Sequence, residues 1–265
     1  MKNMTHFKRA LGTFLIGVGF DPRKTLAALR AFPYYVNNLS TLKRQWRFEN
    51  ATEIFRLVPT LSDLYSASGT AKGHYFHQDL WAAREIFRRK PLRHLDVGSR
   101  IDGFIAHLLC FRDVEVIDIR KLESKVRGLS FKQADMMQGH TDSSLKADSV
   151  SCLHALEHFG LGRYGDPIDL NGWKKGIANI ASIAQPGAVV YLSVPIGRPA
   201  IEFNAQRIFS PEHFTNEAAL NELTLESFSL VDDLGDFQEG VSFEAADGVI
   251  FGCGCFVFKK HQNNA

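Results

Sequence analysis

Long apolar runs are missing from this sequence of 265 residues, and so is a strong excess of charge of one sign. No stretch of about 18 apolar residues is present, so we expect no helix that spans a bilayer. The net charge is only +2, which gives no general reason to expect a nucleic-acid partner. Hydrophobic residues make up 45% of the chain, enough for one sizeable core, which excludes a disordered or collagen-like protein.

Cysteines are few, and their spacing is not that of a disulfide framework or a metal-binding motif. The four cysteines form no Cys-x-x-Cys pair and lie in apolar stretches, at Cys110, Cys152, Cys253 and Cys255. Such a pattern is typical of buried thiols in a reducing compartment. We therefore expect a cytoplasmic protein.

Basic residues are concentrated at the start of the chain. Residues 1–47 hold nine Lys and Arg and a single acid, Asp21, so this segment has a net charge of +8 and the remainder −6. The apolar stretch 11–20 resembles the core of a secretion signal, but no small-x-small cleavage site follows it. We expect a retained basic helical extension and linker over 1–74, followed by the main domain over 75–265.

Three roles are open for this basic extension. Its basic and apolar side chains suit peripheral contact with an anionic membrane surface through residues 1–47, at the inner face of the membrane. It also suits holding an acidic partner, or packing as a helical cap with solvated charges. The acidic balance of the remaining chain argues against a nucleic-acid partner, because phosphate contacts need a basic surface.

Helical and extended patterns alternate along the main domain. Apolar spacing predicts helices over 4–17, 22–47, 77–89, 103–110 and 171–184, with a short helix and a loop within 50–74. Apolar runs predict strands at 92–97, 113–118, 129–135, 149–154, 188–194, 225–233 and 248–260. The alternation predicts an α/β fold with a parallel sheet, and no helix separates the last two strands, which predicts an antiparallel edge hairpin.

The segment 94–104, HLDVGSRIDGF, has the pattern of a strand, a tight turn and a helix. Gly98 lets a ligand approach the backbone, and the helix N-terminus offers unpaired N–H groups. Asp96 can take a ligand ammonium group or orient the amides of the turn. Asp118 follows Gly98 by about 20 residues, the separation expected for a carboxylate that accepts ribose hydroxyls. Together these residues predict a nucleoside-binding edge.

Further candidates follow the third and fourth strands. Asp135 and Met136 can hold an adenine amino group, or Asp135 can simply end its strand. His154, Glu157 and His158 lie at the ligand-binding edge, where one of them can act as a general base; otherwise they cap and pack against the helix. The two histidines have metal-ligand spacing, but no Glu follows the first directly, so we assign no metal site.

The order of these features resembles the class I S-adenosylmethionine-dependent methyltransferases. The glycine turn, the ribose acid, the acid after the third strand and a Leu-Glu-His segment recur there in this order, and the match covers about 75–260. More narrowly, four segments resemble the bacterial proteins called domain of unknown function 268: HYFHQDLWAA (74–83), DVGSRIDGF (96–104), HALEHFGLGRYGDP (154–167) and LSVPIG (192–197). Those proteins are methyltransferase-like and often associated with surface-polysaccharide genes.

The resemblance implies a Rossmann-like, mostly parallel seven-stranded sheet with an antiparallel last strand, and S-adenosylmethionine as the cofactor. The cofactor contacts expected are Asp96, Gly98, Ser99, Arg100, Gly103, Asp118, Asp135, Met136, His77 and Gln78. The catalytic residues expected are His154, Glu157 and His158. Polar loops after the fourth and fifth strands suit a polyhydroxylated, anionic acceptor, or are ordinary surface loops; their candidate residues are Arg163, Tyr164, Asp166, Arg198, Asn204 and Arg207.

The turn departs from the family pattern Asp-x-Gly-x-Gly-x-Gly. Asp96 and Gly98 match it, but Arg100 and Asp102 replace the second and third glycines, and Gly103 comes one position late. Three outcomes are open, because function depends on the site rather than on the fold. The remodelled turn still binds S-adenosylmethionine, or it binds another nucleotide-like ligand, or it has lost binding.

Two functions of different classes follow from these observations. The first is a methyltransferase that O-methylates a sugar or glycan intermediate in surface-polysaccharide biosynthesis. The second is a non-catalytic, methyltransferase-like module that binds within a membrane-associated glycan-assembly complex.

Overall fold

The computed structural model describes residues 11–139 and 145–262 of the chain. The chain divides into two compact units, residues 1–70 and 71–265. No helix within the described ranges combines the length and the apolar character needed to cross a membrane. The start of the helix expected over 4–17 lies outside the described residues.

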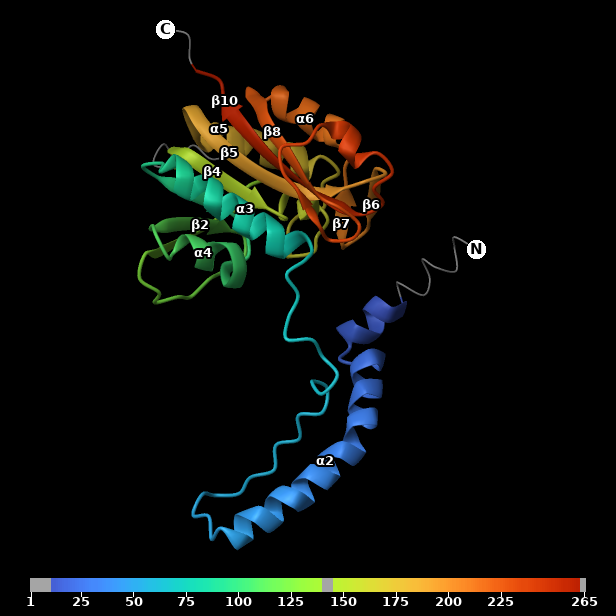
Figure 1. The fold of residues 1–265 in the computed structure, drawn as a ribbon. Coiled ribbons are helices and arrows are strands. Elements are labelled where there is room, and N and C mark those ends of the chain that lie inside the picture. Colours follow the sequence, from blue (N-terminus) through green and yellow to red (C-terminus); the bar gives the residue numbers. More distant parts are fainter. Residues whose placement is uncertain (1–10, 140–144, 263–265) are drawn as a thin grey trace. The chain divides into compact units, whose positions relative to one another are not determined.

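The first unit is helical and then extended (Figure 1). Residues 11–17 are helical, and α2 spans Pro22–Phe48. The Asp21 carboxylate caps α2 by accepting hydrogen bonds from backbone N–H groups of its first turn, where proline is also favoured. The short helix expected after residue 50 is absent: residues 51–73 contain no helix. That prediction was wrong because serine and glycine in this stretch favour turns over helix.

The second unit is built on an eight-stranded sheet with the order β3-β2-β1-β4-β5-β10-β8-β9. Its strands are β1 His94–Val97, β2 Val114–Asp118, β3 Leu129–Gln133, β4 Ala147–Leu153, β5 Ala184–Ile196, β8 Leu223–Val231, β9 Phe237–Gln238 and β10 Gly252–Lys260. Strands β1 to β5 pair in parallel, and β10 is antiparallel to both β5 and β8. The expected Rossmann-like sheet is confirmed, with β10 inserted between β5 and β8 and the short β9 added at the edge.

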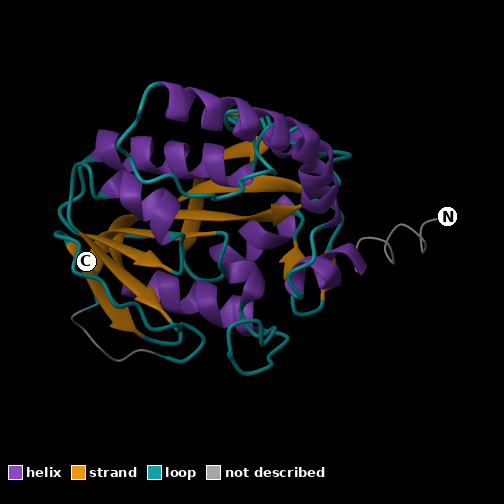
Figure 2. Cartoon of the chain, turned by 90° about the horizontal axis from the view of Figure 1, so that it is seen from below, coloured by secondary structure: helices purple, strands orange, loops and turns teal. Residues whose placement is uncertain are grey.

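Helices cover both faces of the sheet (Figure 2). They are α3 His74–Arg89, the π-helical turn Ile101–Ile105 that leads into α4 Ala106–Leu108, α5 Gly172–Ile183 and α6 Pro211–Ala219. Successive side chains of β5 point to opposite faces of the sheet. Tyr191 packs on the face covered by α3 and α4, and Leu192 on the face covered by α5 and α6. A hairpin of β6 Ala200–Glu202 and β7 Gln206–Ile208 follows β5.

A chain of buried polar side chains links β1 to β4. The Ser149 hydroxyl lies 2.7 Å from His94 Nδ1, His94 Nε2 lies 3.0 Å from Ser151 Oγ, and Ser151 donates to Asp96 at 2.5 Å. Because the Ser151 proton goes to Asp96, Ser151 accepts from the Nε2–H of a neutral His94. Burial lowers the pKa of His94 to about 3 and raises the pKa of Asp96 to about 6.

We expect His94 to make the folded protein sensitive to acid. In the unfolded chain this histidine becomes protonated below about pH 6.5, but in the folded chain only near pH 3. Neutral His94 therefore makes its full contribution to the free energy of unfolding above about pH 6.5. As pH falls between the two, stability decreases by up to about 1.4 kcal/mol per pH unit. Urea unfolding of the wild type and His94→Gln at about pH 7 and about pH 4.5 measures this.

The His94→Gln variant should lose less stability between the two pH values than the wild type does. Asp96 acts in the opposite direction, because its raised pKa makes the stability fall as pH rises from about 3.8 to about 6. It is present in both proteins, so the comparison isolates the histidine. Equal losses in the two proteins would contradict the assignment.

Candidate functional site

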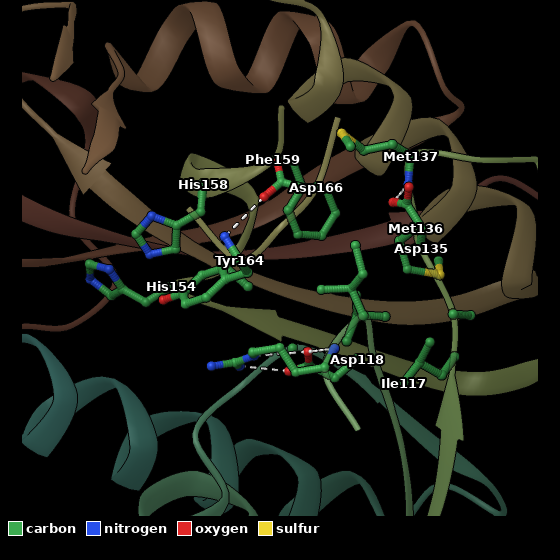
Figure 3. Close-up of a pocket in the computed structure, with 16 residues that line it drawn as sticks. Ile117, Asp118, Asp135, Met136, Met137, His154, His158, Phe159, Tyr164 and Asp166 are labelled. Atoms are coloured by element: carbon green, nitrogen blue, oxygen red, sulfur yellow. Dashed lines mark hydrogen bonds and ion pairs between the residues drawn. The ribbon is translucent and has the colours of Figure 1, made fainter. Parts of the chain in front are cut away.

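The carboxyl ends of β1, β2, β3 and β4 meet at one edge of the sheet and line a cavity of about 530 Å³, here called the first cavity (Figure 3). Gly98 follows β1, Asp118 ends β2, Met136 follows β3, and His154 and His158 follow β4. The cavity lies where the strand order reverses between β1 and β4, which is where open α/β sheets bind ligands.

The turn after β1 depends on Gly98 and Asp96. Gly98 has φ of 69°, and a Cβ on it would lie 3.1 Å from the Cβ of Ala155, so a side chain is disfavoured. The buried Asp96 carboxylate accepts from the Ser99 N–H at 3.0 Å and the Ser99 hydroxyl at 2.6 Å. Ser99 Oγ in turn accepts from the Leu153 N–H at 3.0 Å. Asp96 thus orients the turn from beneath and is not among the lining residues of the first cavity.

The residues that replace the family glycines have local partners. Arg100 forms a bidentate pair with Asp102, with Nε–Oδ1 at 3.2 Å and Nη2–Oδ2 at 3.1 Å, and both side chains are exposed. The Arg100 guanidinium lies 4.8 Å from the Tyr75 ring centroid. At Gly103 a Cβ would overlap the Asp79 carboxylate of α3. Arg100 is therefore neutralised locally, and Gly103 permits the approach of α3.

Asp118, the expected ribose acid, is held by Arg120. Its Oδ1 accepts from the Arg120 N–H at 2.8 Å and from Nε at 3.1 Å, and its Oδ2 accepts from Nη2 at 2.7 Å. The Arg120 guanidinium also lies 4.3 Å from the ring centroid of Tyr164. A ribose diol that reaches Asp118 would compete with these contacts.

Asp135 and Met136 lie on the side of the cavity opposite His158 (Figure 3). The Asp135 carboxylate accepts from the Met137 N–H at 2.9 Å. Met136 is buried, and with Ile117 it gives this side of the cavity an apolar wall. A wall of this kind beside a carboxylate suits a planar base with an amino group.

His154 and Glu157 form a buried pair after β4. His154 Nδ1 lies 2.6 Å from Glu157 Oε1, and the two side chains are 5% and 1% exposed. His154 has φ of 50° and donates its N–H to the Ser193 carbonyl at 2.9 Å. Burial alone would lower the pKa of His154, but the Glu157 charge raises it to about 10. Without a further ligand, His154 is therefore a cation at neutral pH rather than a free base.

His158 has a different state from His154. Its Nδ1 lies 2.6 Å from the Ala205 carbonyl, which can only accept, so Nδ1 carries the proton. The lone pair is then on Nε2, which lies 3.7 Å from Glu157 Oε1. Burial lowers the pKa of His158, which keeps the ring neutral. Of the three expected catalytic residues, His158 has the geometry of a general base.

Of the six expected acceptor residues, Tyr164 and Asp166 line the first cavity, and Arg163 precedes Tyr164 in the same loop. The Arg163 guanidinium lies 5.4 Å from the Tyr164 ring centroid, and Arg163 Nη1 donates to the Ala205 carbonyl at 3.0 Å. Asp166 shapes this loop, because its carboxylate accepts the N–H of Gly160 at 2.8 Å and the N–H of Tyr164 at 3.2 Å.

Four further expected residues do not line the first cavity, nor the second cavity that adjoins it. Arg198 is exposed, and Asn204 sits in the β6–β7 turn with φ of 59°. The His77 ring stacks on a phenylalanine of β9 with centroids 5.7 Å apart. Gln78 is buried, and its Oε1 accepts from a β5 serine hydroxyl at 2.6 Å. These contacts belong to the packing of α3 and of the hairpin.

A second cavity, of about 1100 Å³, adjoins the first. The two share the lining residues Gly98, Asp118, Arg120, His154, His158 and Tyr164. Four basic side chains, those of Arg100, Arg120, Lys121 and Arg163, line the second cavity together with the acidic side chains of Asp102 and Asp118, so basic groups are in excess. Such a lining suits an anionic ligand. Our reading of the sequence missed Arg120 and Lys121, although they directly follow the strand that ends in Asp118.

Arg207, the last expected acceptor residue, is buried instead. It is 3% exposed and donates to the backbone carbonyls of Glu157, Phe159, Asp169 and Leu170, at 3.4, 2.5, 3.2 and 3.2 Å. The guanidinium thus ties the loop after β4 to the segment that leads into α5.

Comparison with known proteins gives a family resemblance. The family model described as "Caenorhabditis protein of unknown function, DUF268" matches residues 107–216, from α4 into α6. The expected resemblance to this family is confirmed. None of the curated proteins that were compared matches the sequence.

Solved structures show the fold. N-methyltransferase NodS from Bradyrhizobium japonicum WM9, in complex with S-adenosyl-L-homocysteine, is 14% identical, covers 71% of this chain and 88% of its own, and has a TM-score of 0.50. The 1,6-didemethyltoxoflavin-N1-methyltransferase of Burkholderia thailandensis, with bound 1,6-didemethyltoxoflavin and S-adenosylhomocysteine, is 12% identical, with coverages of 88% and 91% and a TM-score of 0.50.

A cyclase, SpnF, shares the same architecture. It is 11% identical, with coverages of 74% and 86% and a TM-score of 0.53. The chain therefore has the class I methyltransferase fold, as expected. Because a cyclase and methyltransferases share this fold, the activity must be argued from the site.

We predict that Arg207 acts on stability. Arg207→Met removes a buried guanidinium that donates to four backbone carbonyls, so the free energy of unfolding should fall by about 2 to 4 kcal/mol. The matched control is Arg198→Met, an exposed position that should change it by less than about 0.5 kcal/mol. Urea unfolding measures both variants. Equal effects of the two substitutions would contradict a structural role for Arg207 and would favour its expected role in acceptor binding.

Proposed function

We propose that this protein is an S-adenosylmethionine-dependent methyltransferase that methylates a hydroxyl group of a polyhydroxylated, anionic acceptor of the sugar or glycan class. One observation carries the proposal. The first cavity, with Gly98 and Asp118 at its edge, adjoins a second cavity that four basic side chains line. A nucleoside-type site beside a basic acceptor site is the arrangement that such a transfer needs.

The residues of the first cavity fit this cofactor. Gly98 leaves the backbone open to close approach, Asp118 offers a carboxylate for the ribose, and Met136 offers an apolar wall for the base. Two proteins of the same fold were crystallised with S-adenosylhomocysteine, the demethylated form of the cofactor.

The chain's own contribution to the reaction would be orientation and proton removal. Bound S-adenosylmethionine supplies a methyl group that its sulfonium already activates. His158 Nε2 would take the acceptor's hydroxyl proton, while its Nδ1–H remains donated to the Ala205 carbonyl. Lys121 and Arg163 would hold the acceptor's anionic group, which places the hydroxyl for attack and limits its motion.

One observation favours a second candidate, the non-catalytic binding module. Asp118 already accepts three hydrogen bonds from Arg120. If this pair persists, the carboxylate that a ribose needs is engaged, and the first cavity takes no nucleoside. The chain would then act by binding within a glycan-assembly complex.

Calorimetry with S-adenosylhomocysteine separates these candidates. Asp118→Ala should weaken binding by about 10- to 100-fold, because charge-assisted hydrogen bonds to the ribose are lost. Arg120→Ala should leave the affinity within about threefold or increase it, since it frees Asp118. The control is Glu239→Ala, which removes an exposed carboxylate that lines neither cavity. Absence of binding by folded wild type, with binding by Arg120→Ala, would favour the module; absence in both would exclude the cofactor.

We also propose that the first unit makes peripheral contact with an anionic membrane surface, at the inner face of the cytoplasmic membrane. Helix α2 exposes large apolar side chains, among them Leu26, Leu29 and Phe32. Its basic residues are Arg23, Lys24, Arg30, Lys43, Arg44 and Arg47. Basic residues beside exposed apolar ones favour the surface of an anionic bilayer.

Sedimentation with anionic vesicles tests this contact. The double variant Arg44→Gln/Arg47→Gln should bind about 10- to 30-fold more weakly, because each basic residue near the surface contributes about 1 kcal/mol. A double variant in the second unit, Lys125→Gln/Arg127→Gln, removes the same charge and should bind as the wild type does. Equal losses in both variants, or binding that added salt leaves unchanged, would contradict the contact.

A further inference from the structure

Three metal-ligating side chains that the proposed function does not use as ligands lie together beside the cavities. They are His74, His154 and Cys253, whose ligand atoms all lie within 4.8 Å of one another. His74 is the first residue of α3, His154 follows β4, and Cys253 lies in β10, where it pairs with Pro195 near the end of β5. The sheet order therefore gathers residues that are far apart in the sequence.

We propose that His74, His154 and Cys253 bind a zinc ion. Zinc takes neutral imidazole nitrogen and Cys thiolate, and three protein ligands with an open fourth position are typical of its reactive sites. Zinc bonds of about 2.0 to 2.3 Å hold tetrahedral ligand atoms about 3.3 to 3.8 Å apart. From separations of at most 4.8 Å, small side-chain movements suffice to close the site.

The unpartnered nitrogen of His154 points most directly to a ligand. The imidazole is only 5% exposed, and its Nε2 is buried without a hydrogen-bond partner among the described residues. A buried polar atom in this state is costly. A bound cation in place of a proton at Nε2 would give the nitrogen a partner and would bring in the ligand atoms of His74 and Cys253.

Both histidines are oriented by hydrogen bonds of the kind that surround zinc sites. His154 Nδ1 is bonded to Glu157 at 2.6 Å, and the His74 ring is bonded to the backbone of Phe251. Such partners fix the tautomer and make the opposite nitrogen a better ligand. Glu157 is thus a positioning residue for the ion, which explains a fully buried carboxylate in this place.

Charges at the site balance when the ion is bound. Zinc binding releases the Cys253 thiol proton and any proton on His154 Nε2 to solvent. The two positive charges of zinc then face the Cys253 thiolate and the Glu157 carboxylate. The other printed contacts of the Cys253 sulfur are weak: Gln78 Oε1 at 3.7 Å, the Gly254 carbonyl at 3.8 Å and the sulfur of Cys255 at 3.8 Å.

The ligand set differs from the histidine pair that spacing suggests. His158 is four residues from His154, but its Nδ1 is taken by the Ala205 carbonyl, and it is not part of the cluster. His154 lines both cavities, so an ion on it would border the place where a ligand binds. The proposed zinc site does not depend on S-adenosylmethionine, and zinc binding can be measured in the absence of that cofactor.

Metal titration of the full-length protein tests the site. The reduced protein is stripped with a chelator and titrated with Zn²⁺ or Co²⁺. We expect one ion per chain, and for cobalt a thiolate charge-transfer band in the near ultraviolet with strong tetrahedral bands in the visible. Cys253→Ala should lower the affinity by at least about 100-fold and abolish the charge-transfer band.

Cys255→Ala is the matched control, because Cys255 is equally buried and lies two residues further along the same strand. It should keep the affinity within about threefold and keep the band. Glu157→Gln should weaken binding by about 10- to 100-fold without removing the band. Circular dichroism shows whether each variant is folded.

Two results would overturn the zinc site. One is a folded, reduced wild type that binds no ion or gives a cobalt spectrum without a thiolate band, and this result needs no variant. The other is equal affinity in the wild type and a folded Cys253→Ala, which would leave only adventitious surface binding. Neither result bears on the binding of S-adenosylhomocysteine, which is measured separately.

Discussion

The buried carboxylate of Asp96 holds together the point at which the sheet reverses its order. It accepts from Ser99 in the turn after β1 and from Ser151 in β4, so it joins the two strands that diverge there. Ser99 extends the connection to the Leu153 N–H at the end of β4. The carboxyl ends that line both cavities are therefore fixed to one another from beneath, by hydrogen bonds that no solvent reaches.

Three pairs of opposite charges lie around the cavities. Arg100 pairs with Asp102, Arg120 with Asp118, and His154 with Glu157. In the first two pairs the arginine side chain is about half-exposed, so exchanging the arginine for a ligand costs little. The pair of His154 and Glu157 is buried, so it can change only by exchanging one buried partner for another of comparable charge. The arginine pairs can therefore open toward solvent, whereas the pair of His154 and Glu157 cannot.

The fold could be predicted from the sequence because local patterns of apolar and turn residues determine its elements. The strand, turn and helix around Gly98 and the carboxylate of Asp118 are local features, and the structure has them within a few residues of the expected bounds. Contacts between distant segments have no such signal. Arg207 is a basic residue in a polar stretch of sequence, which is why it was expected to bind the acceptor. In the structure it is buried and donates hydrogen bonds to four carbonyls of two other segments.

The same reasoning explains the altered glycine turn. A glycine is needed where φ is positive and a neighbour is close, and in this turn that position is Gly98, which is retained. At the second family position Arg100 meets no such constraint, because its φ is −66° and its side chain leaves toward Asp102 and Tyr75. The turn therefore keeps the one glycine on which its backbone depends. The Arg100 guanidinium lies on the wall of the second cavity, where Asp102 pairs with it.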